Sequence, residues 1–282
     1  MAANDQFFVA GSLIGRPSLV FQDADHNDYI QVDAAAVALV AANNVSGTFT
    51  AWINLANLTD TMTIIGAGDD NLVEFIELNV EAGLLTCRVT DGATVQFITQ
   101  ADQIDFKSHR WYHVAVTQRA GGDGVELYVD GQLIARTNDT TTDLNSWFEE
   151  TDAIDTMRIG AANKVGNGSV TNDFIGGISD VKYFDVPLTD AQVIDDWNGV
   201  ANTTNLHSHW DWSDDLVDAG SGTDNGTKVG DVVLCNNHCE FCSRLRYDCG
   251  GTLIGADATK DVIKLFSNGT GNKGFGLIIQ QA

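Results

Sequence analysis

Short segments in which apolar and polar residues alternate recur along the chain from Ser18 to Lys182, with glycine-rich turns between them. Alternation with a period of two is typical of antiparallel strands that bury one face, whereas apolar residues at helical spacing are scarce. This succession predicts an all-β fold, a two-sheet antiparallel β-sandwich of the jelly-roll kind. The expected strands are Ser18–Phe21, Tyr29–Val32, Gly47–Leu55, Met62–Gly66, Val73–Asn79, Leu84–Thr90, Thr94–Thr99, Trp111–Gln118, Gly124–Val129, Gln132–Arg136, Met157–Ile159 and Gly176–Phe184.

Two local motifs predict a conformation directly. Asp130 and Gly131 stand between two alternating runs, and an Asp-Gly pair supplies the two positive-φ positions of a type I′ hairpin turn. Leu188–Trp197 has apolar residues at helical spacing, with Thr189 as a suitable N-cap. We therefore expect a tight hairpin and one short helix that closes an edge of the sandwich.

Several longer motifs occur in a fixed order, and together they resemble a known family. They are Gly47–Ile53, Arg110–Val116, the Asp130-Gly131 hairpin, Met157–Gly160, Phe174–Phe184 and Pro187–Gln192. This order is similar to that of laminin-G-like jelly-roll domains in the concanavalin A-like lectin and glucanase superfamily, over about Ser18–Trp197. The resemblance implies a recognition fold that often holds calcium at one rim and binds glycans or protein ligands around it.

The 282 residues suffice for one large domain with an appendage. We expect an N-terminal arm over residues 1–17, the sandwich over 18–230 and a small cysteine-containing segment over 231–282. The stretch His209–Thr227 looks like the segment that usually opens such a domain. It either completes this sandwich in a permuted arrangement or begins a truncated second copy, and the short remainder of the chain favours the first.

The C-terminal segment contains four cysteines within fifteen residues, Cys235, Cys239, Cys242 and Cys249. Such density indicates either a zinc site, with His238 as an extra ligand, or two disulfides. The spacing does not decide between them, and free thiols are a further alternative. Cys87 lies in an apolar strand and is expected to be a buried small hydrophobe.

Acidic residues outnumber basic ones by 39 to 15, which gives a formal net charge of -24. Nucleic acid is therefore an unsuitable partner, because phosphate binding needs clustered cations. Solubility is the simplest consequence of this charge, although carboxylates also attract calcium. Asp69, Asp70 and Asn71 are the tentative calcium ligands at the rim. Each of the other acidic candidates (Asp23, Asp25, Asp28 and Asp180) is better explained as a turn or a strand-end contact.

Because the superfamily that this sequence resembles contains glucanases, a catalytic function must be considered. Glycoside hydrolysis needs two carboxylates on opposite sides of the scissile bond. The segment Glu150–Asp155 superficially resembles the catalytic strand of those enzymes, but it ends in Asp, has polar neighbours and lies in a predicted loop. We expect no enzyme activity.

The six tryptophans divide into two groups. Trp52, Trp111 and Trp197 occupy motif positions that should be core, whereas Trp147 is unassigned. Trp210 and Trp212 are two residues apart on an expected strand, so they should share a face and pack against the sandwich.

The N-terminus lacks the basic start and apolar run of a secretion signal, and no run of residues is long enough to cross a membrane. With the acidic surface and the recognition fold, this predicts a virion surface subunit, such as a phage capsid decoration or fibre protein, in a homo-oligomer or capsid. The alternative is a calcium-dependent carbohydrate-binding or adhesion module of a secreted bacterial protein, which would be extracellular. Calcium and zinc are the cofactors considered, and glycans are a possible ligand.

Overall fold

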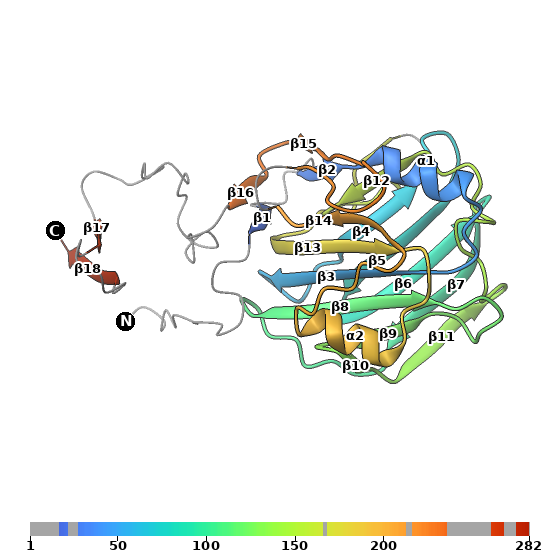
Figure 1. Cartoon of the computed structure of the whole chain (residues 1–282), viewed down its shortest axis with the longest axis horizontal. Helices are drawn as coiled ribbons and strands as arrows, with labels where there is room; N and C mark the ends of the chain where they lie inside the picture. Colours follow the sequence, from blue (N-terminus) through green and yellow to red (C-terminus); the bar gives the residue numbers. More distant parts are fainter. Residues whose placement is uncertain are drawn as a thin grey trace. The chain divides into compact units, whose positions relative to one another are not determined.

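The computed structural model describes residues 17–21, 28–165, 168–212, 216–235, 261–267 and 275–281. The chain divides into two compact units, residues 1–238 and 239–282. The first unit is a sandwich of two eight-stranded sheets (Figure 1). The predicted all-β sandwich is therefore confirmed. In the second unit, β17 (Asp261–Ser267) and β18 (Phe275–Gln281) form an antiparallel hairpin.

The first sheet contains the predicted type I′ hairpin at one edge. In sheet order it consists of β10 (Gln132–Leu133), β9 (Glu126–Val129), β8 (Trp111–Gln118), β3 (Gly47–Leu55), β13 (Gly176–Phe184), β1 (Ser18–Phe21) and β16 (Val233–Cys235), with β14 (Leu206–Trp210) also paired to β13. All of these pairings are antiparallel.

The second sheet packs its apolar face against the first. In sheet order it consists of β11 (Arg136–Thr141), β7 (Thr94–Ala101), β6 (Leu84–Asp91), β5 (Phe75–Glu81), β4 (Met62–Gly68), β12 (Thr156–Ile159), β2 (Tyr29–Gln31) and β15 (Thr227–Val229). Alternate residues of β6, namely Leu85, Cys87 and Val89, are fully buried in the core. Burial raises the pKa of the Cys87 thiol, so this cysteine is the buried hydrophobe that was predicted.

The segment after the helical region completes the same sandwich. Strand β14 pairs with β13, β15 pairs with β2, and β16 pairs with β1. Trp210 and Trp212 are fully buried against the core, as predicted. The strand ends at Trp210, however, and Trp212 has a left-handed backbone with φ 57°. The two rings are therefore not successive positions of one strand.

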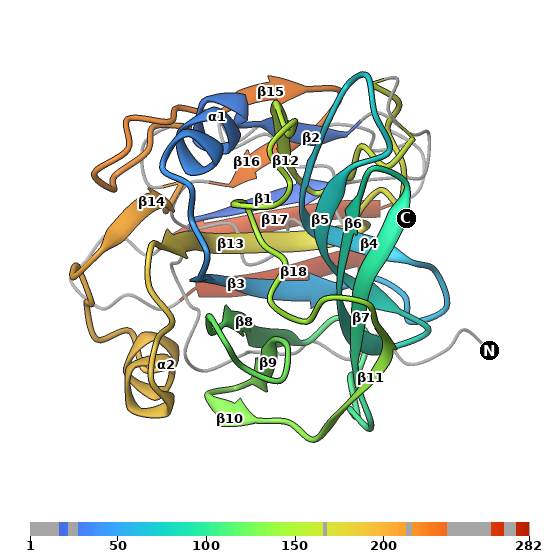
Figure 2. The same cartoon turned by 90° about the vertical axis from the view of Figure 1, so that its right-hand side faces the viewer.

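Within the described residues two helices accompany the sheets, one more than was predicted. Figure 2 shows α2 (Asp190–Trp197) beside the β9–β10 end of the first sheet and α1 (Asp33–Ala41) beside β12 and β2. Helix α1 consists almost entirely of alanine and valine, so it has no polar face to give an amphipathic period. Its high alanine content nevertheless favours the helix. No helix within the described residues is long and apolar enough to span a membrane.

Candidate binding site beside helix α2

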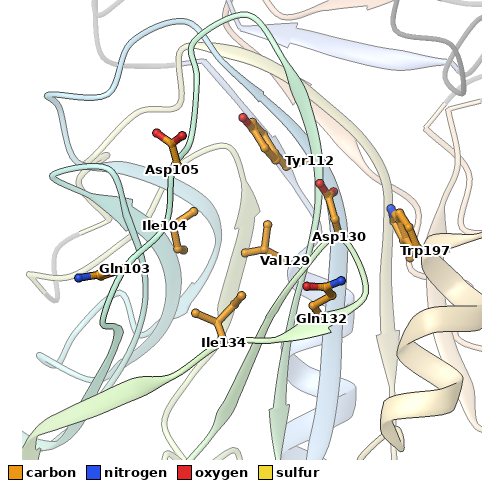
Figure 3. A pocket seen from close by; sticks show the side chains of 9 residues that line it. All are labelled: Gln103, Ile104, Asp105, Tyr112, Val129, Asp130, Gln132, Ile134 and Trp197. Atoms are coloured by element: carbon orange, nitrogen blue, oxygen red, sulfur yellow. The ribbon is translucent and has the colours of Figure 1, made fainter.

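A hollow of about 420 Å³ opens at the β10 edge of the first sheet (Figure 3). Four separate parts of the chain form it: the connection from β7 to β8, Tyr112 of β8, the β9–β10 hairpin with Ile134 after it, and the last residue of α2. Its wall consists of Gln103, Ile104, Asp105, Tyr112, Val129, Asp130, Gln132, Ile134 and Trp197. In Figure 3 the isoleucine and valine side chains gather in the middle, with polar groups around them and Trp197 on one side.

The hairpin turn explains how Trp197 reaches the hollow. Asp130 and Gly131 have φ values of 49° and 75°, as the predicted type I′ turn requires. A Cβ atom at position 131 would lie 2.9 Å from Trp197 Cε3. The missing side chain of Gly131 therefore leaves the space in which the indole packs against the turn.

Helix α2 holds Trp197 at its C-terminal end. Its predicted N-cap is confirmed, because Thr189 Oγ1 accepts a hydrogen bond from Gln192 N (3.3 Å) and Gln192 Oε1 accepts one from Thr189 N (2.9 Å). This reciprocal pair is a capping box, which fixes where the helix begins. The fixed start and the eight-residue length place Trp197 over the hairpin.

A chain of charged groups, buried at His113 and Asp196 and half-buried at its other members, attaches α2 to the outer face of the first sheet. His113 Nε2 lies 3.0 Å from Asp196 Oδ2, and Lys182 Nζ lies 2.7 Å from Asp196 Oδ1. Lys182 Nζ also lies 3.0 Å from Asp180 Oδ2, whose Oδ1 lies 2.6 Å from His209 Nε2. This chain of charged groups therefore joins β8, β13, β14 and α2. Its member on α2 is Asp196, the residue directly before Trp197.

The groups in this chain of charged side chains stabilise one another's charged forms. Burial alone would raise the pKa of Asp196, but the His113 hydrogen bond and the Lys182 charge lower it to about 2. Burial opposes ionisation of Asp180 too, and His209 and Lys182 bring its pKa below the ordinary range. Burial would lower the pKa of Lys182, yet the two carboxylates raise it. All three groups are thus charged at neutral pH.

Replacement of Lys182 by methionine should destabilise the fold by about 3–5 kcal/mol, because it leaves the buried Asp196 and the half-buried Asp180 without their shared cation. Carboxylates with a lowered folded-state pKa contribute stability above their unfolded pKa, about 3.9, and lose that contribution as the pH falls toward about 2. Lys182→Met removes one of the groups that lower the pKa of Asp196 and Asp180, while the histidines remain, so acid unfolding should begin at a higher pH. Circular dichroism across an acid titration measures the shift.

The exposed Lys228 on β15 provides the matched control. Lys228→Met removes the same charge without touching this chain of charged groups. If both variants unfolded at the pH of the unmodified protein, the stabilising role of these charges would be wrong.

The polar groups in the wall of the hollow are of two kinds. Asp130 Oδ1 accepts a hydrogen bond from His113 N (3.0 Å), and Asp105 pairs with Lys107, so both carboxylates have protein partners. Within the described part of the chain, no group is hydrogen-bonded to the side-chain amides of Gln103 or Gln132, and both residues are exposed. These amides are available to a ligand.

The chemistry of the hollow suits a polyhydroxylated ring. Trp197 is half-buried, so one part of the indole faces the opening. An aromatic face beside a few convergent polar groups is the usual composition of a small-ligand site.

The sequence predicted that Trp197 and Trp111 lie in the core, and that was wrong, since both are only half-buried. Trp52 is buried as predicted, and Trp147 is fully buried.

A family model described as the concanavalin A-like lectin/glucanases superfamily, of the laminin G type, matches residues 24–194, which is more than half of the chain. The chain belongs to this superfamily. Comparison with curated protein sequences finds no match. The family resemblance predicted from the ordered motifs is thereby confirmed.

Solved structures share the fold of this superfamily member. The CBM40 module of Ruminococcus gnavus IT-sialidase, bound to α2,3-sialyllactose, is 14% identical with a TM-score of 0.51, covering 65% of this chain and 98% of that one. A candidate carbohydrate-binding protein of Bacteroides ovatus is 19% identical with a TM-score of 0.51, covering 79% and 60%. A heptameric SAP-like pentraxin of Limulus polyphemus is 15% identical with a TM-score of 0.50, covering 80% and 97%. At these identities the likeness concerns the fold.

The predicted calcium ligands lie in the turn between β4 and β5 of this lectin-like sandwich. Asp69 Oδ1 accepts hydrogen bonds from the backbone N–H groups of Asn71 and Leu72, and Asp70 Oδ1 accepts one from Asn163 Nδ2 (2.6 Å). These carboxylate oxygens shape the turn. No group of three or more histidine, cysteine or acidic side chains within the described residues is arranged to hold a metal ion. Calcium binding at this rim therefore stays a prediction.

The cysteine prediction lies largely outside the described residues, which include neither Cys239, Cys242 nor Cys249. The backbone of Cys235 ends β16, which pairs with β1 of the sandwich. The choice among a zinc site, disulfides and free thiols stays a prediction. Asp23 and Asp25 also lie outside the described residues.

The remaining acidic candidates have structural roles. Asp28 Oδ1 accepts a hydrogen bond from Asp231 N (2.6 Å), and Asp180 belongs to the chain of charged groups. The segment Glu150–Asp155 is a loop before β12, as expected, and Asp155 Oδ1 accepts a hydrogen bond from Asp70 N (3.1 Å). It therefore does not project alternate carboxylates from a strand.

A second hollow of about 410 Å³ lies on the second sheet, around strands β5, β6, β7 and β11. It contains Arg88, which pairs with Glu81 (Nη2 to Oε2, 3.7 Å), and it has no aromatic side chain in its wall. The hollow beside α2 is the stronger candidate for a sugar, because its wall contains both Tyr112 and Trp197.

Proposed function

We propose that this chain is a non-catalytic carbohydrate-binding module that holds a sugar ring in the hollow beside α2. The observation that carries the proposal is the half-buried Trp197 at the edge of the hollow, whose wall also includes two exposed glutamines with no hydrogen-bond partner for their amides among the described residues. The indole would stack on a pyranose face, while Gln103 and Gln132 would donate to and accept from its hydroxyl groups. Membership of a lectin-containing superfamily supports the same assignment.

The carboxylates of the hollow do not suit hydrolysis. A glycosidase needs one carboxylic acid that donates a proton and one carboxylate that acts as nucleophile or base. Asp130 is held by the backbone N–H of His113, and Asp105 is held by Lys107. Binding without bond cleavage is therefore the proposed activity.

This assignment follows the alternative drawn from the sequence, and extracellular localisation is proposed with it. The solved structures described above are a CBM40 module, a candidate carbohydrate-binding protein and a pentraxin, and they give the virion surface subunit no support. Assembly into a homo-oligomer stays a prediction.

The test of the proposed function is glycan binding by the full 282-residue chain. A glycan array followed by isothermal titration calorimetry should show saturable binding to at least one saccharide, with no loss of the saccharide on prolonged incubation. A folded protein that binds nothing on the array would contradict the proposal, and release of free sugar would contradict its non-catalytic part.

Calcium dependence is the second part of the proposal. The pKa values of Glu74 and Asp155 are raised by burial and also by the carboxylates around Asp69, so this turn concentrates negative charge. Calcium should raise the midpoint of thermal unfolding, and EDTA should reverse the change. Asp70→Asn should remove the effect, whereas Asp139→Asn on the exposed side of β11 should retain it. A midpoint of thermal unfolding that does not change with calcium would contradict the calcium dependence but not the saccharide binding.

A further inference from the structure

The wall of the hollow beside α2 contains acidic as well as aromatic side chains. Asp105 and Asp130 contribute carboxylates to its wall, and the nine residues of that wall include no lysine or arginine. The chain as a whole has a formal net charge of -24. Because like charges repel most strongly at close range, an anionic ligand would enter this hollow against the local field.

The end of helix α2 adds to this field. Trp197 is the last residue of the helix, and a helix C-terminus carries a partial negative charge. The last turn of α2 has no basic residue that would offset it. The aromatic face proposed to stack on the sugar therefore lies where an anion is destabilised.

Among the described residues, Lys107 and Arg110 are cations in contact with residues of the wall, and each has a partner there. Lys107 pairs with Asp105, and the Arg110 guanidinium carbon lies 5.0 Å from the centre of the Tyr112 ring. Recognition of a sugar carboxylate or sulfate requires a well-placed cation, preferably a bidentate arginine. Neither side chain is in the wall of the hollow.

We infer that the hollow selects uncharged saccharides and rejects acidic ones, such as sialylated or sulfated glycans. This inference names the ligand class of the site and rests on the proposed function. It separates this chain from the CBM40 module of the same fold, whose structure contains sialyllactose. Shape and hydroxyl contacts would decide which neutral sugar binds, and charge would exclude the acidic members of each series.

The experiment uses an array in which each neutral glycan stands beside its sialylated and its sulfated form, followed by calorimetry with lactose and 3′-sialyllactose. The neutral member of a binding pair should bind at least tenfold more tightly at low ionic strength. The difference should shrink in 1 M salt, where the Debye length is about 3 Å. Asp105→Asn should also shrink it, because it removes one carboxylate from the wall.

A matched control variant distinguishes rejection of acidic saccharides from saccharide binding itself. Asp139→Asn removes an exposed aspartate outside the wall and should leave the ratio unchanged. If acidic members bound as tightly as neutral ones and lost binding in Trp197→Ala, the charge inference would be overturned while the proposed function stood. If no glycan on the array bound, both would fall together.

Discussion

Replacement of Trp210 by alanine should lower the free energy of unfolding by about 3–5 kcal/mol, the usual cost of truncating a large buried aromatic side chain. The Trp210 side chain is fully buried, and its Nε1 donates a hydrogen bond to the Asp224 carbonyl (2.8 Å). It lies on β14, paired with Val181 of β13. The change would therefore leave a cavity and an unpaired carbonyl where β14 joins the first sheet. Urea unfolding measures the loss.

Trp111→Ala is the control for this experiment, because Trp111 is only half-buried and should lose much less stability. The slope of the unfolding free energy against urea should stay the same for both variants, since each should still unfold as one unit. A loss below about 1 kcal/mol for Trp210→Ala would mean that β14 is not part of the sandwich core.

Replacement of Trp197 by alanine should weaken saccharide binding at least tenfold, about 1.4 kcal/mol or more, because the stacking surface of the hollow is removed. The cost in stability should be smaller than for Trp210→Ala, since Trp197 is half-buried. Trp197→Phe retains a smaller aromatic face and should have an intermediate affinity. Calorimetry of the folded variants measures the change.

Trp111→Ala is the matched control here as well, because it removes an equally large, half-buried indole that does not line the hollow. Its affinity should equal that of the unmodified chain. Equal losses in Trp111→Ala and Trp197→Ala would show that the loss comes from general destabilisation rather than from stacking.

Much of the sandwich follows from local sequence. Alternation marks the buried strands, and the Asp130-Gly131 pair and the Thr189 cap fix a turn and a helix start at the predicted residues. Strand β11 was not predicted, because Arg136–Thr141 is polar at every position and forms an exposed edge. Such a strand is held by pairing with β7, which is a tertiary contact.

The candidate site was harder to predict than the fold. Its wall comes from residues 103–105, Tyr112, the 129–134 hairpin and Trp197, and only the folded chain brings these together. The motif position of Trp197 indicated core packing. One signal could have shown otherwise: a glycine is obligatory at position 131 of the turn, and its missing side chain leaves one face of that turn open to a neighbour.

The most direct test of carbohydrate binding in this hollow is an NMR titration of the ¹⁵N-labelled chain with the saccharide that binds most tightly in solution. The proposal predicts that the indole N–H signal of Trp197 and the side-chain amide signals of Gln103 and Gln132 shift together and saturate at one ligand per chain. Assignment follows from the signals lost in Trp197→Ala and Gln132→Ala. Shifts confined to residues around Arg88 on the second sheet, with the Trp197 signal unchanged, would contradict the account.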